Sequence, residues 1–482
     1  MKNSIFTFLF VICSLLFGIC HAQWQPDVRL TNDPAESGTS GNNAWCIASS
    51  GSIAHAVWFD LRVGNYEIYY KRSTDGGVSW GTDTRLTNNS AVSGYPSVAV
   101  SGSVVHVVLH DNRDGNYEIY YKRSTDAGLT WGTDTRLTNN SAGSLRPSVS
   151  LSGQVVHVVW RDNRDGNEEI YYKRSTDGGV SWEMDTRLTN NSAVSGNPSV
   201  SVSGQIVNVL WHDLRDGNYE IYYKRSTDGG VSWGTDTRLT NNSAASYDPT
   251  SSISGQVVHL VWSDLRDGNP EVYYKRSTDG GSNWSADIRL TNNTAPSWYP
   301  SISVDGSFVH IVWYDERDGN AEMYYKRSTD VGVTWGADTR LTNNSAGSYD
   351  PSISVSGQVV HIVWKDNRDG NEEIYYKRDP TGNPIGIINI NTEIPNQFSL
   401  SQNYPNPFNP MTVISFQLAV NSFASLKVYD LLGREVATLV NEELKPGTYE
   451  VDWSADKFAS GVYYYKLTAG DYTETKKMVL IK

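Results

Sequence analysis

The tetrapeptide Arg-Leu-Thr-Asn recurs along this chain at a nearly constant interval. Its seven copies begin at Arg29, Arg85, Arg136, Arg187, Arg238, Arg289 and Arg340, so the first interval is 56 residues and every later one is 51. Self-similarity at this period is typical of repeat architectures, in which each unit buries its apolar face against the next. The repeat therefore indicates an array of similar structural units over most of the chain.

Each repeat unit predicts four short strands. In the second unit, the β-branched segments 97–100 and 104–110 are followed by the turn 111–116, whose Asp-Gly pair is a hairpin signal. Segments 118–123 and 135–138 complete the unit. Four strands per unit of this length predict a β-propeller blade and an all-β fold.

The order of the strands predicts how the propeller closes. The first three strands of the unit occur seven times, and the fourth also occurs seven times, but its first copy, Val28–Thr31, precedes all other strands. The last unit ends at Arg378 without a fourth strand. We therefore predict a seven-bladed propeller over residues 23–379 in which Val28–Thr31 pairs with the strand that ends at Arg378 and removes the open edge.

A second motif, Ser-x-Asp-x-Gly-x-Ser/Thr/Asn-Trp, follows the third strand of six units. It resembles the Asp-box (BNR) repeat of sialidase-type propellers. Aspartate can accept backbone N–H groups within its own tight turn, and tryptophan buries a large area, so we predict a structural role. The resemblance implies the same, because in the family the box lies away from the active site. The six copies contain Asp75, Asp126, Asp177, Asp228, Asp279 and Asp330, with Trp80, Trp131, Trp182, Trp233, Trp284 and Trp335.

Strands of a blade alternate in direction, so the Asp-x-Arg-Asp-Gly-Asn turns between the second and third strands lie on the face opposite the Asp boxes. Three interpretations are open. The turns could be hairpins held by Asp–Arg–Glu salt bridges with the glutamate that follows each turn, such as Glu118. They could also form a ring that binds sugar hydroxyls or a carboxylated polymer, or calcium sites. The candidate ligand-binding residues are Arg62, Arg113, Arg164, Arg215, Arg266, Arg317 and Arg368, with Asp60, Asp111, Asp162, Asp213, Asp264, Asp315 and Asp366.

Two positions on the same face vary among the units. They are the residue before the first aspartate of this turn and the pair before the proline that opens the first strand. Aromatic residues at these positions are further candidates for ligand binding, namely Tyr95, Trp298, Tyr299 and Tyr349.

The formal net charge of −13 argues against nucleic-acid binding. The resemblance to sialidases raises the possibility of an enzyme, but the acids and arginines of the repeated turns have equivalents in every blade, whereas catalysis needs carboxylates in unlike environments. We therefore expect a monomer that binds a glycan or another extracellular polymer without catalysis, and we assign no catalytic residue and no metal or other cofactor. The alternatives are a sialidase or other glycoside hydrolase, and a structural surface protein.

The two ends of the chain predict its export. Residues 1–22, with an apolar run over 5–19, predict a cleaved signal peptide. Residues 380–397, which begin with a Pro/Gly-rich segment, are predicted to be a linker. The alternation within 398–482 predicts an Ig-like β-sandwich.

Segments 402–410 (Gln-Asn-Tyr-Pro-Asn-Pro-Phe-Asn-Pro) and 444–453, with the Lys-Lys-Met at 476–478, are similar to the type A sorting domain of the type IX secretion system. The resemblance implies type IX machinery as a partner and a secreted or cell-surface location. An ordinary ligand-binding module is the alternative.

Overall fold

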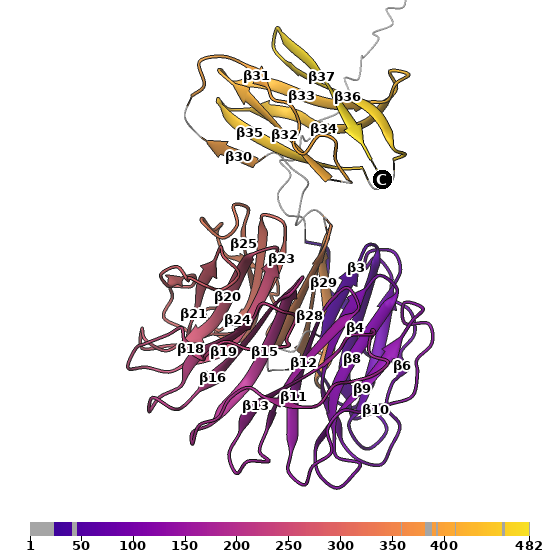
Figure 1. Cartoon of the computed structure of the whole chain (residues 1–482), viewed down its shortest axis with the longest axis vertical. Helices are drawn as coiled ribbons and strands as arrows, with labels where there is room; N and C mark the ends of the chain where they lie inside the picture. The colour runs from indigo at the N-terminus through magenta and orange to yellow at the C-terminus, as the bar shows by residue number, and fades with distance from the viewer. Residues whose placement is uncertain are drawn as a thin grey trace, which may run out of the picture.

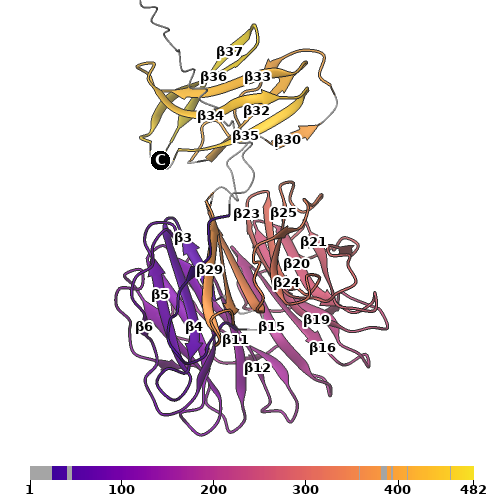
Figure 2. The ribbon, with the colours of Figure 1, turned by 180° about the vertical axis from the view of Figure 1, so that it is seen from behind.

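The computed structural model describes residues 24–40, 46–357, 359–380, 388–391, 394–409, 411–455 and 458–481. The predicted signal peptide, 1–22, lies outside these residues. Within them the regular elements are β-strands, and no helix is long and apolar enough to cross a bilayer. Seven antiparallel sheets form between residues 28 and 379 and are arranged as blades around an axis, as Figures 1 and 2 show. The predicted all-β propeller is therefore confirmed.

The strands of the seven blades follow the repeat. Blade 1 contains β2 (Ser37–Gly38), β3 (Ile47–Ser50), β4 (Ile53–Asp60), β5 (Glu67–Ser73) and β6 (Thr84–Arg85). Blade 2 contains β7 (Ser93–Ser101), β8 (Val104–Asp111), β9 (Glu118–Ser124) and β10 (Thr135–Arg136), and blade 3 contains β11 (Ser144–Ser152), β12 (Val155–Asp162), β13 (Glu169–Ser175) and β14 (Thr186–Arg187). Blade 4 contains β15 (Ser195–Ser203), β16 (Ile206–Asp213), β17 (Glu220–Ser226) and β18 (Thr237–Arg238), and blade 5 contains β19 (Ser246–Ser254), β20 (Val257–Asp264), β21 (Glu271–Ser277) and β22 (Ile288–Arg289). Blade 6 contains β23 (Ser297–Asp305), β24 (Phe308–Asp315), β25 (Glu322–Ser328) and β26 (Thr339–Arg340), and blade 7 contains β27 (Ser348–Ser356), β28 (Val359–Asp366), β29 (Glu373–Asp379) and β1 (Val28–Arg29).

Strand β1 closes the ring as predicted. It pairs antiparallel with β29, with Val28 opposite Tyr376 and Arg29 opposite Tyr375. The residues before β1 also replace a tryptophan contact that the last repeat lacks. Trp24 packs edge-on against Tyr325, with ring centroids 4.9 Å apart, as the Asp-box tryptophans pack in other blades. The N-terminal segment therefore completes both the sheet and the side-chain contacts of the last blade.

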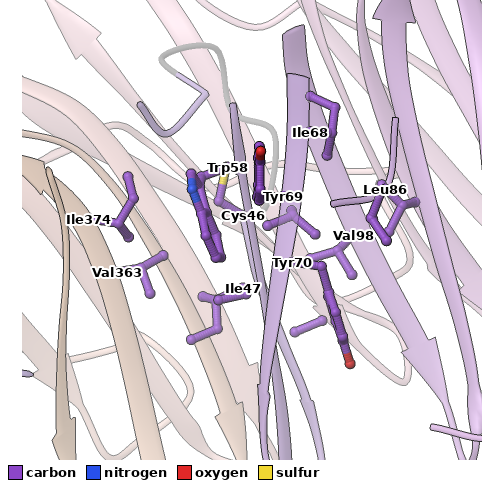
Figure 3. Close-up of a cluster of buried hydrophobic side chains, with 14 of the residues drawn as sticks. Cys46, Ile47, Trp58, Ile68, Tyr69, Tyr70, Leu86, Val98, Val363 and Ile374 are labelled. Atoms are coloured by element: carbon purple, nitrogen blue, oxygen red, sulfur yellow. The ribbon is translucent and has the colours of Figure 1, made fainter. Parts of the chain in front are cut away.

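Neighbouring blades share apolar layers because alternate residues of a strand point to opposite faces of its sheet. In Figure 3, Trp58 lies beside Val363 and Ile374 of blade 7, while Tyr70 lies on the side of Val98 from blade 2. A tight contact fixes the spacing: a Cβ added at Gly128 would lie 1.8 Å from the Tyr70 hydroxyl, and the φ of this glycine is +81°. Only glycine fits this turn without displacing the next blade.

The innermost strands surround the axis of the propeller. A cavity of about 340 Å³ lies between them and is lined by small residues such as Ala48 and Ser150 and by aliphatic residues such as Val98 and Ile302. These residues lie toward the C-terminal ends of the innermost strands. The N-terminal ends of the same strands contribute to the axial surface described in the next subsection.

The C-terminal part is a two-sheet β-sandwich, as predicted. Its first sheet contains β30 (Ile388–Asn391), β35 (Gly447–Ser454), β32 (Met411–Leu418) and β31 (Ser399–Leu400), and its second contains β34 (Glu435–Leu444), β33 (Ser422–Tyr429), β36 (Gly461–Ala469) and β37 (Tyr472–Leu480). Phe416, Leu426, Trp453 and Tyr465 are among its buried core residues. The linker predicted at 380–397 needs correction, because β30 lies within it and pairs with β35.

Candidate functional site

The Asp boxes form closed turns at one face of the propeller, which we call the Asp-box face. In blade 3, Asp177 accepts hydrogen bonds from the backbone N–H and the hydroxyl of Ser181, at 2.9 and 2.6 Å, and from the hydroxyl of Ser175 at 2.8 Å. Such bonds from Ser79 lower the pKa of the equivalent Asp75 to about 2. Each carboxylate is used within its own turn.

The Asp-box tryptophans pack against tyrosines of the preceding blade. Trp182 meets Tyr121 edge-on with a centroid separation of 4.9 Å, and Trp80 meets Tyr376 in the same way. The other pairs are Trp131 with Tyr70, Trp233 with Tyr172, Trp284 with Tyr223 and Trp335 with Tyr274. The geometry of the box is that of an inter-blade contact.

The repeated arginines lie on the opposite face, which we call the hairpin face, and each is folded onto two aspartates. In blade 3, Arg164 Nε lies 2.8 Å from Asp162 Oδ1 and its Nη1 lies 2.8 Å from Asp185 Oδ2, while the guanidinium covers the ring of Tyr171 at 4.3 Å. Asp185 directly precedes Thr186, the first residue of β14, so the arginine reaches toward the outer strand rather than the axis. Arg62, Arg113, Arg215, Arg266, Arg317 and Arg368 pair in the same way with Asp60, Asp111, Asp213, Asp264, Asp315 and Asp366, and with Asp83, Asp134, Asp236, Asp287, Asp338 and Asp27.

The first aspartate of each pair is deeply buried and fully hydrogen-bonded. Asp162 is 1% exposed and also accepts bonds from Trp160 Nε1 at 2.9 Å and from the Ser144 hydroxyl at 2.8 Å. Burial alone would raise the pKa of Asp162, but the hydrogen bonds from Arg164, Trp160 and Ser144 outweigh it and lower that pKa. Of the interpretations made from the sequence, the geometry is that of the salt-bridged hairpin, and it does not bring the seven arginines together. The glutamate expected in this salt bridge needs correction, because Glu169 pairs with Arg187 of the outer strand and not with Arg164.

A different set of side chains meets at the axis on the hairpin face. In six blades, the residue before the proline of the first strand has a left-handed φ near +50°, next to a shift in strand register. Non-glycine residues rarely adopt this conformation, and such strain gathers at functional sites. The set comprises Tyr95, Arg146, Asn197, Asp248, Tyr299 and Asp350, and Thr39 takes the same place in blade 1.

Contacts join this set around the axis. Arg146 Nη1 donates to Asn197 Oδ1 at 2.9 Å, and Asn197 Nδ2 donates to Asp248 Oδ1 at 2.8 Å. The hydroxyl of Thr39 donates to the carbonyl oxygen of Asp350 at 2.8 Å. The charges of Arg146, Asp248 and Asp350, from blades 3, 5 and 7, influence one another across the axis.

Two further positions per blade surround this set. One was identified from the sequence as variable and contains Phe59, His110, Arg161, His212, Ser263, Tyr314 and Lys365. The other, which the sequence analysis missed, is the residue before the buried glutamate of the third strand: Tyr66, Tyr117, Glu168, Tyr219, Pro270, Ala321 and Glu372. Together with the left-handed set and with Tyr247, Trp298 and Tyr349, these residues form what we call the axial cluster.

Blades 4 to 7 contribute a continuous run of aromatic rings to the axial cluster. Centroids of successive rings lie 5.2 Å apart for Tyr219 and Tyr247, 6.5 Å for Tyr247 and Trp298, and 6.4 Å for Trp298 and Tyr299. The run continues through Tyr314, 5.9 Å from Tyr299, to Tyr349, 5.4 Å further on. Each of these six rings is partly exposed. Of the four aromatic candidates from the sequence, Trp298, Tyr299 and Tyr349 therefore lie in one run, while Tyr95 lies beside Phe59 and His110 on the other side.

The acids of the axial cluster are unlike the repeated ones. Asp248 is 5% exposed, and burial raises its pKa to about 6, although Asn197 and Arg146 act in the opposite direction. Burial also raises the pKa of Asp350, whose Oδ2 lies 3.3 Å from Lys365 Nζ. The expectation from the sequence is that each acid on this face has an equivalent in every blade. This holds for the hairpins and fails at the axis, where only blades 5 and 7 contribute an aspartate to the left-handed set.

Metal ligation was one of the interpretations of the hairpins. In the parts of the chain that the structure describes, no group of three or more His, Cys, Asp or Glu side chains is placed to hold a metal ion. Within each hairpin, the first aspartate is instead paired with its arginine.

Comparisons with known proteins agree with this architecture. A xyloglucanase from Paenibacillus sp. is 24% identical over 236 residues, which cover 47% of this chain and 19% of that protein. Xyloglucanase Xgh74A from Acetivibrio thermocellus is 30% identical over 93 residues, covering 18% of this chain and 11% of that protein. This chain therefore spans about a fifth or less of the length of these curated relatives.

Two solved structures match the chain at low sequence identity. The polysaccharide lyase Uly1 matches with a TM-score of 0.51 at 9% identity, over 74% of this chain and 99% of that chain. The sialidase of Trypanosoma rangeli matches with a TM-score of 0.43 at 11% identity, over 82% and 85%.

Two protein families match the chain itself. Residues 402–482 match the secretion system C-terminal sorting domain, which confirms the predicted type IX sorting to the cell surface or the extracellular space. Residues 12–259, just over half of the chain, match the BNR repeat-like domain. The protein is therefore a member of the BNR repeat-like family that carries a type IX sorting domain.

Proposed function

We propose that this secreted propeller binds a polysaccharide at the axial cluster. The aromatic run from Tyr219 to Tyr349 is the observation that carries the proposal. Partly exposed aromatic rings offer apolar faces for the C–H groups of sugar rings, and a few polar groups beside them fix orientation. The carboxylates of Asp248 and Asp350 and the amide of Asn197 supply such polar groups next to the run.

The direction of the chain leaves this surface accessible after sorting. Strand β29 begins at Glu373, which pairs with Asp366 at the hairpin face, and ends at Asp379, at the level of the Asp boxes. The polypeptide therefore leaves toward the sorting domain from the face opposite the axial cluster. We propose residues 23–379 as the binding domain, acting as a monomer, and the sandwich as the sorting module.

The names of the relatives support a polysaccharide as the ligand. Two are xyloglucanases and one structural neighbour is a polysaccharide lyase. Because the chain covers only a small part of the xyloglucanases, their activity is not transferred.

Binding is tested with the full chain on an array of neutral and acidic polysaccharides. We expect binding to at least one class, and we expect Trp298→Ala to weaken it at least tenfold through loss of a stacking surface. Phe423→Ala removes an aromatic ring that is 55% exposed in the sorting domain and serves as the control. Absence of binding by the unchanged protein would overturn the proposal in favour of a structural surface protein.

A glycoside hydrolase is the second candidate, and two acids of the axial cluster, Asp248 and Asp350, favour it. Asp248 and Asp350 have raised pKa values in different surroundings, an arrangement that general acid catalysis uses. Turnover of any bound polysaccharide, or of a sialoside, that is lost in both Asp248→Asn and Asp350→Asn would establish the hydrolase. Binding without turnover would leave the binding module.

A further inference from the structure

Arg146 differs from the other arginines of the hairpin face. The arginine of each hairpin is paired with two aspartates, the arginines of the outer strands are paired with buried glutamates such as Glu169, and Arg161 Nη1 lies 2.9 Å from Glu168 Oε2. Arg146 instead donates to an amide oxygen and lies over the ring of Tyr95 at 5.0 Å. No carboxylate oxygen lies within 4.0 Å of its guanidinium among the residues that the structure describes.

The spacing of charges around the axis preserves this cation. Asn197 stands between Arg146 and Asp248, hydrogen-bonded to both, so the nearest acid along the ring is separated from the guanidinium by a neutral side chain. A neutral spacer prevents the ion pair that an aspartate at position 197 would form. The positive charge is therefore kept at the surface of the axial cluster instead of being neutralised within the fold.

The neighbours of Arg146 have unused hydrogen-bonding atoms. Arg161 Nε and His212 Nδ1 are buried and have no hydrogen-bond partner in the described parts of the chain. Buried polar atoms of this kind are rare and call for an explanation such as a ligand or solvent. Burial, together with Arg146 and Arg161, lowers the pKa values of His110 and His212 to about 3, so both rings are neutral at pH 7.

We infer that Arg146 and Arg161 form a subsite for an anionic substituent of the polysaccharide, a carboxylate or a sulfate ester. The inference rests on the proposed function and adds the class of sugar to it. A guanidinium binds either anion through two parallel N–H donors, which gives both strength and orientation. Asp248 and Asp350 lie across the axis, where they repel the anion and can accept hydrogen bonds from sugar hydroxyls.

This arrangement gives the sugar a direction. Its anionic substituent lies at blade 3, its hydroxyls face the acids of blades 5 and 7, and its apolar face lies against the aromatic run of blades 4 to 7. A neutral polysaccharide of the same backbone would satisfy only the last two contacts.

The test uses the full chain and two matched pairs of oligosaccharides. A galacturonate hexasaccharide is compared with its methyl ester, and a κ-carrageenan hexasaccharide with its desulfated form, by calorimetry at low salt. We expect the charged member of one pair to bind at least tenfold more tightly than its neutral partner, and the pair that shows this identifies the anion as a carboxylate or a sulfate.

The informative variant is Arg146→Asn. Blade 4 already has Asn197 at the equivalent left-handed position, and asparagine tolerates this conformation, so the fold is expected to be retained. The variant should bind the charged and neutral members within about twofold of each other. Arg434→Gln removes one positive charge from an exposed site of the sorting domain and should keep the full discrimination.

The results separate failure of the subsite from failure of the proposed function. Equal binding of charged and neutral members by the unchanged protein, or discrimination that survives in Arg146→Asn, would overturn the subsite. Binding to neutral glycans on the array with none to either charged probe would also overturn it. Only a protein that binds no glycan on the array would overturn the proposed function as well.

Discussion

The hairpin arginines and the axial cluster occupy the same face of one propeller and differ in almost every physical respect. The arginines repeat in all seven blades, and each is paired with acids of its own sheet. The axial residues differ from blade to blade, have strained backbone and make their polar contacts across blades. Charged residues that recur in every unit are therefore used for stability here, and the differences among units mark the surface available to a ligand.

The largest change in the free energy of unfolding is expected when a buried aspartate of a hairpin is removed. Asp162→Ala leaves the guanidinium of Arg164, the indole N–H of Trp160 and the hydroxyl of Ser144 without their acceptor. Removing one partner of a buried, hydrogen-bonded ion pair typically costs about 3–5 kcal/mol. We expect a fall of this size in the free energy of unfolding, measured by chemical denaturation.

The matched change at the axis is Asn197→Ala in the adjoining blade, which should cost about 1–2 kcal/mol because it removes two hydrogen bonds made by an uncharged amide. If Asp162→Ala cost no more than this control, the hairpins would not be the stabilising element.

A second prediction concerns the pH dependence of stability at Asp248. Its pKa is raised to about 6 in the folded protein, above the value of about 3.9 in an unfolded chain, so folding favours the protonated acid. The contribution of the protonated Asp248 carboxyl to the stability of the fold is complete below its pKa in the unfolded chain, about 3.9, and is lost as the pH rises through 6. Relative to Asp248→Asn, the unchanged protein should lose about 1–2 kcal/mol between pH 5 and pH 7.5.

Denaturation of both proteins across this range provides the measurement, and titrations elsewhere in the chain cancel in the difference. Asp350→Asn should show the same sign, because burial also raises the pKa of Asp350. The free energy of unfolding of the unchanged protein relative to Asp248→Asn could instead stay constant or grow with pH. That result would show that ionisation of Asp248 does not destabilise the fold, as is the case for the hairpin acids.

Much of the scaffold could be predicted from the sequence because the repeat shows the same pattern seven times. The strand order alone placed Val28–Thr31 beside the last blade, and β1 confirms it. The pairing of Arg164 with Asp185 could not be predicted, because it depends on how far the side chain reaches across the sheet. Position 66 and its equivalents also escaped notice, since one variable residue beside a repeated glutamate is indistinguishable from ordinary loop variation until the blades are brought around an axis.

A third prediction tests whether the axial differences serve binding. Tyr247→Gly gives blade 5 the residue that Gly196 supplies in blade 4 and interrupts the aromatic run between Tyr219 and Trp298. We expect polysaccharide affinity to fall about fivefold, which corresponds to about 1 kcal/mol. The melting temperature should change by no more than a few degrees, since three blades already have glycine at this position. Unchanged affinity would mean that the run is a packing feature and not a sugar platform.

The smallest effect is expected where one repeated residue is exchanged for another that forms the same bonds. In the Asp box of blade 5, the backbone N–H and the side-chain amide of Asn283 donate to Asp279 at 2.8 and 2.7 Å. These are the two bonds that Ser181 gives to Asp177, so Ser181→Asn should leave the melting temperature within about 1 °C of the unchanged protein. Asp177→Ala in the same turn removes the shared acceptor and should lower it clearly, with no effect on polysaccharide binding. If Ser181→Asn altered binding instead, the Asp-box face would take part in recognition, and the division between a repeated scaffold and a varied binding surface would fail.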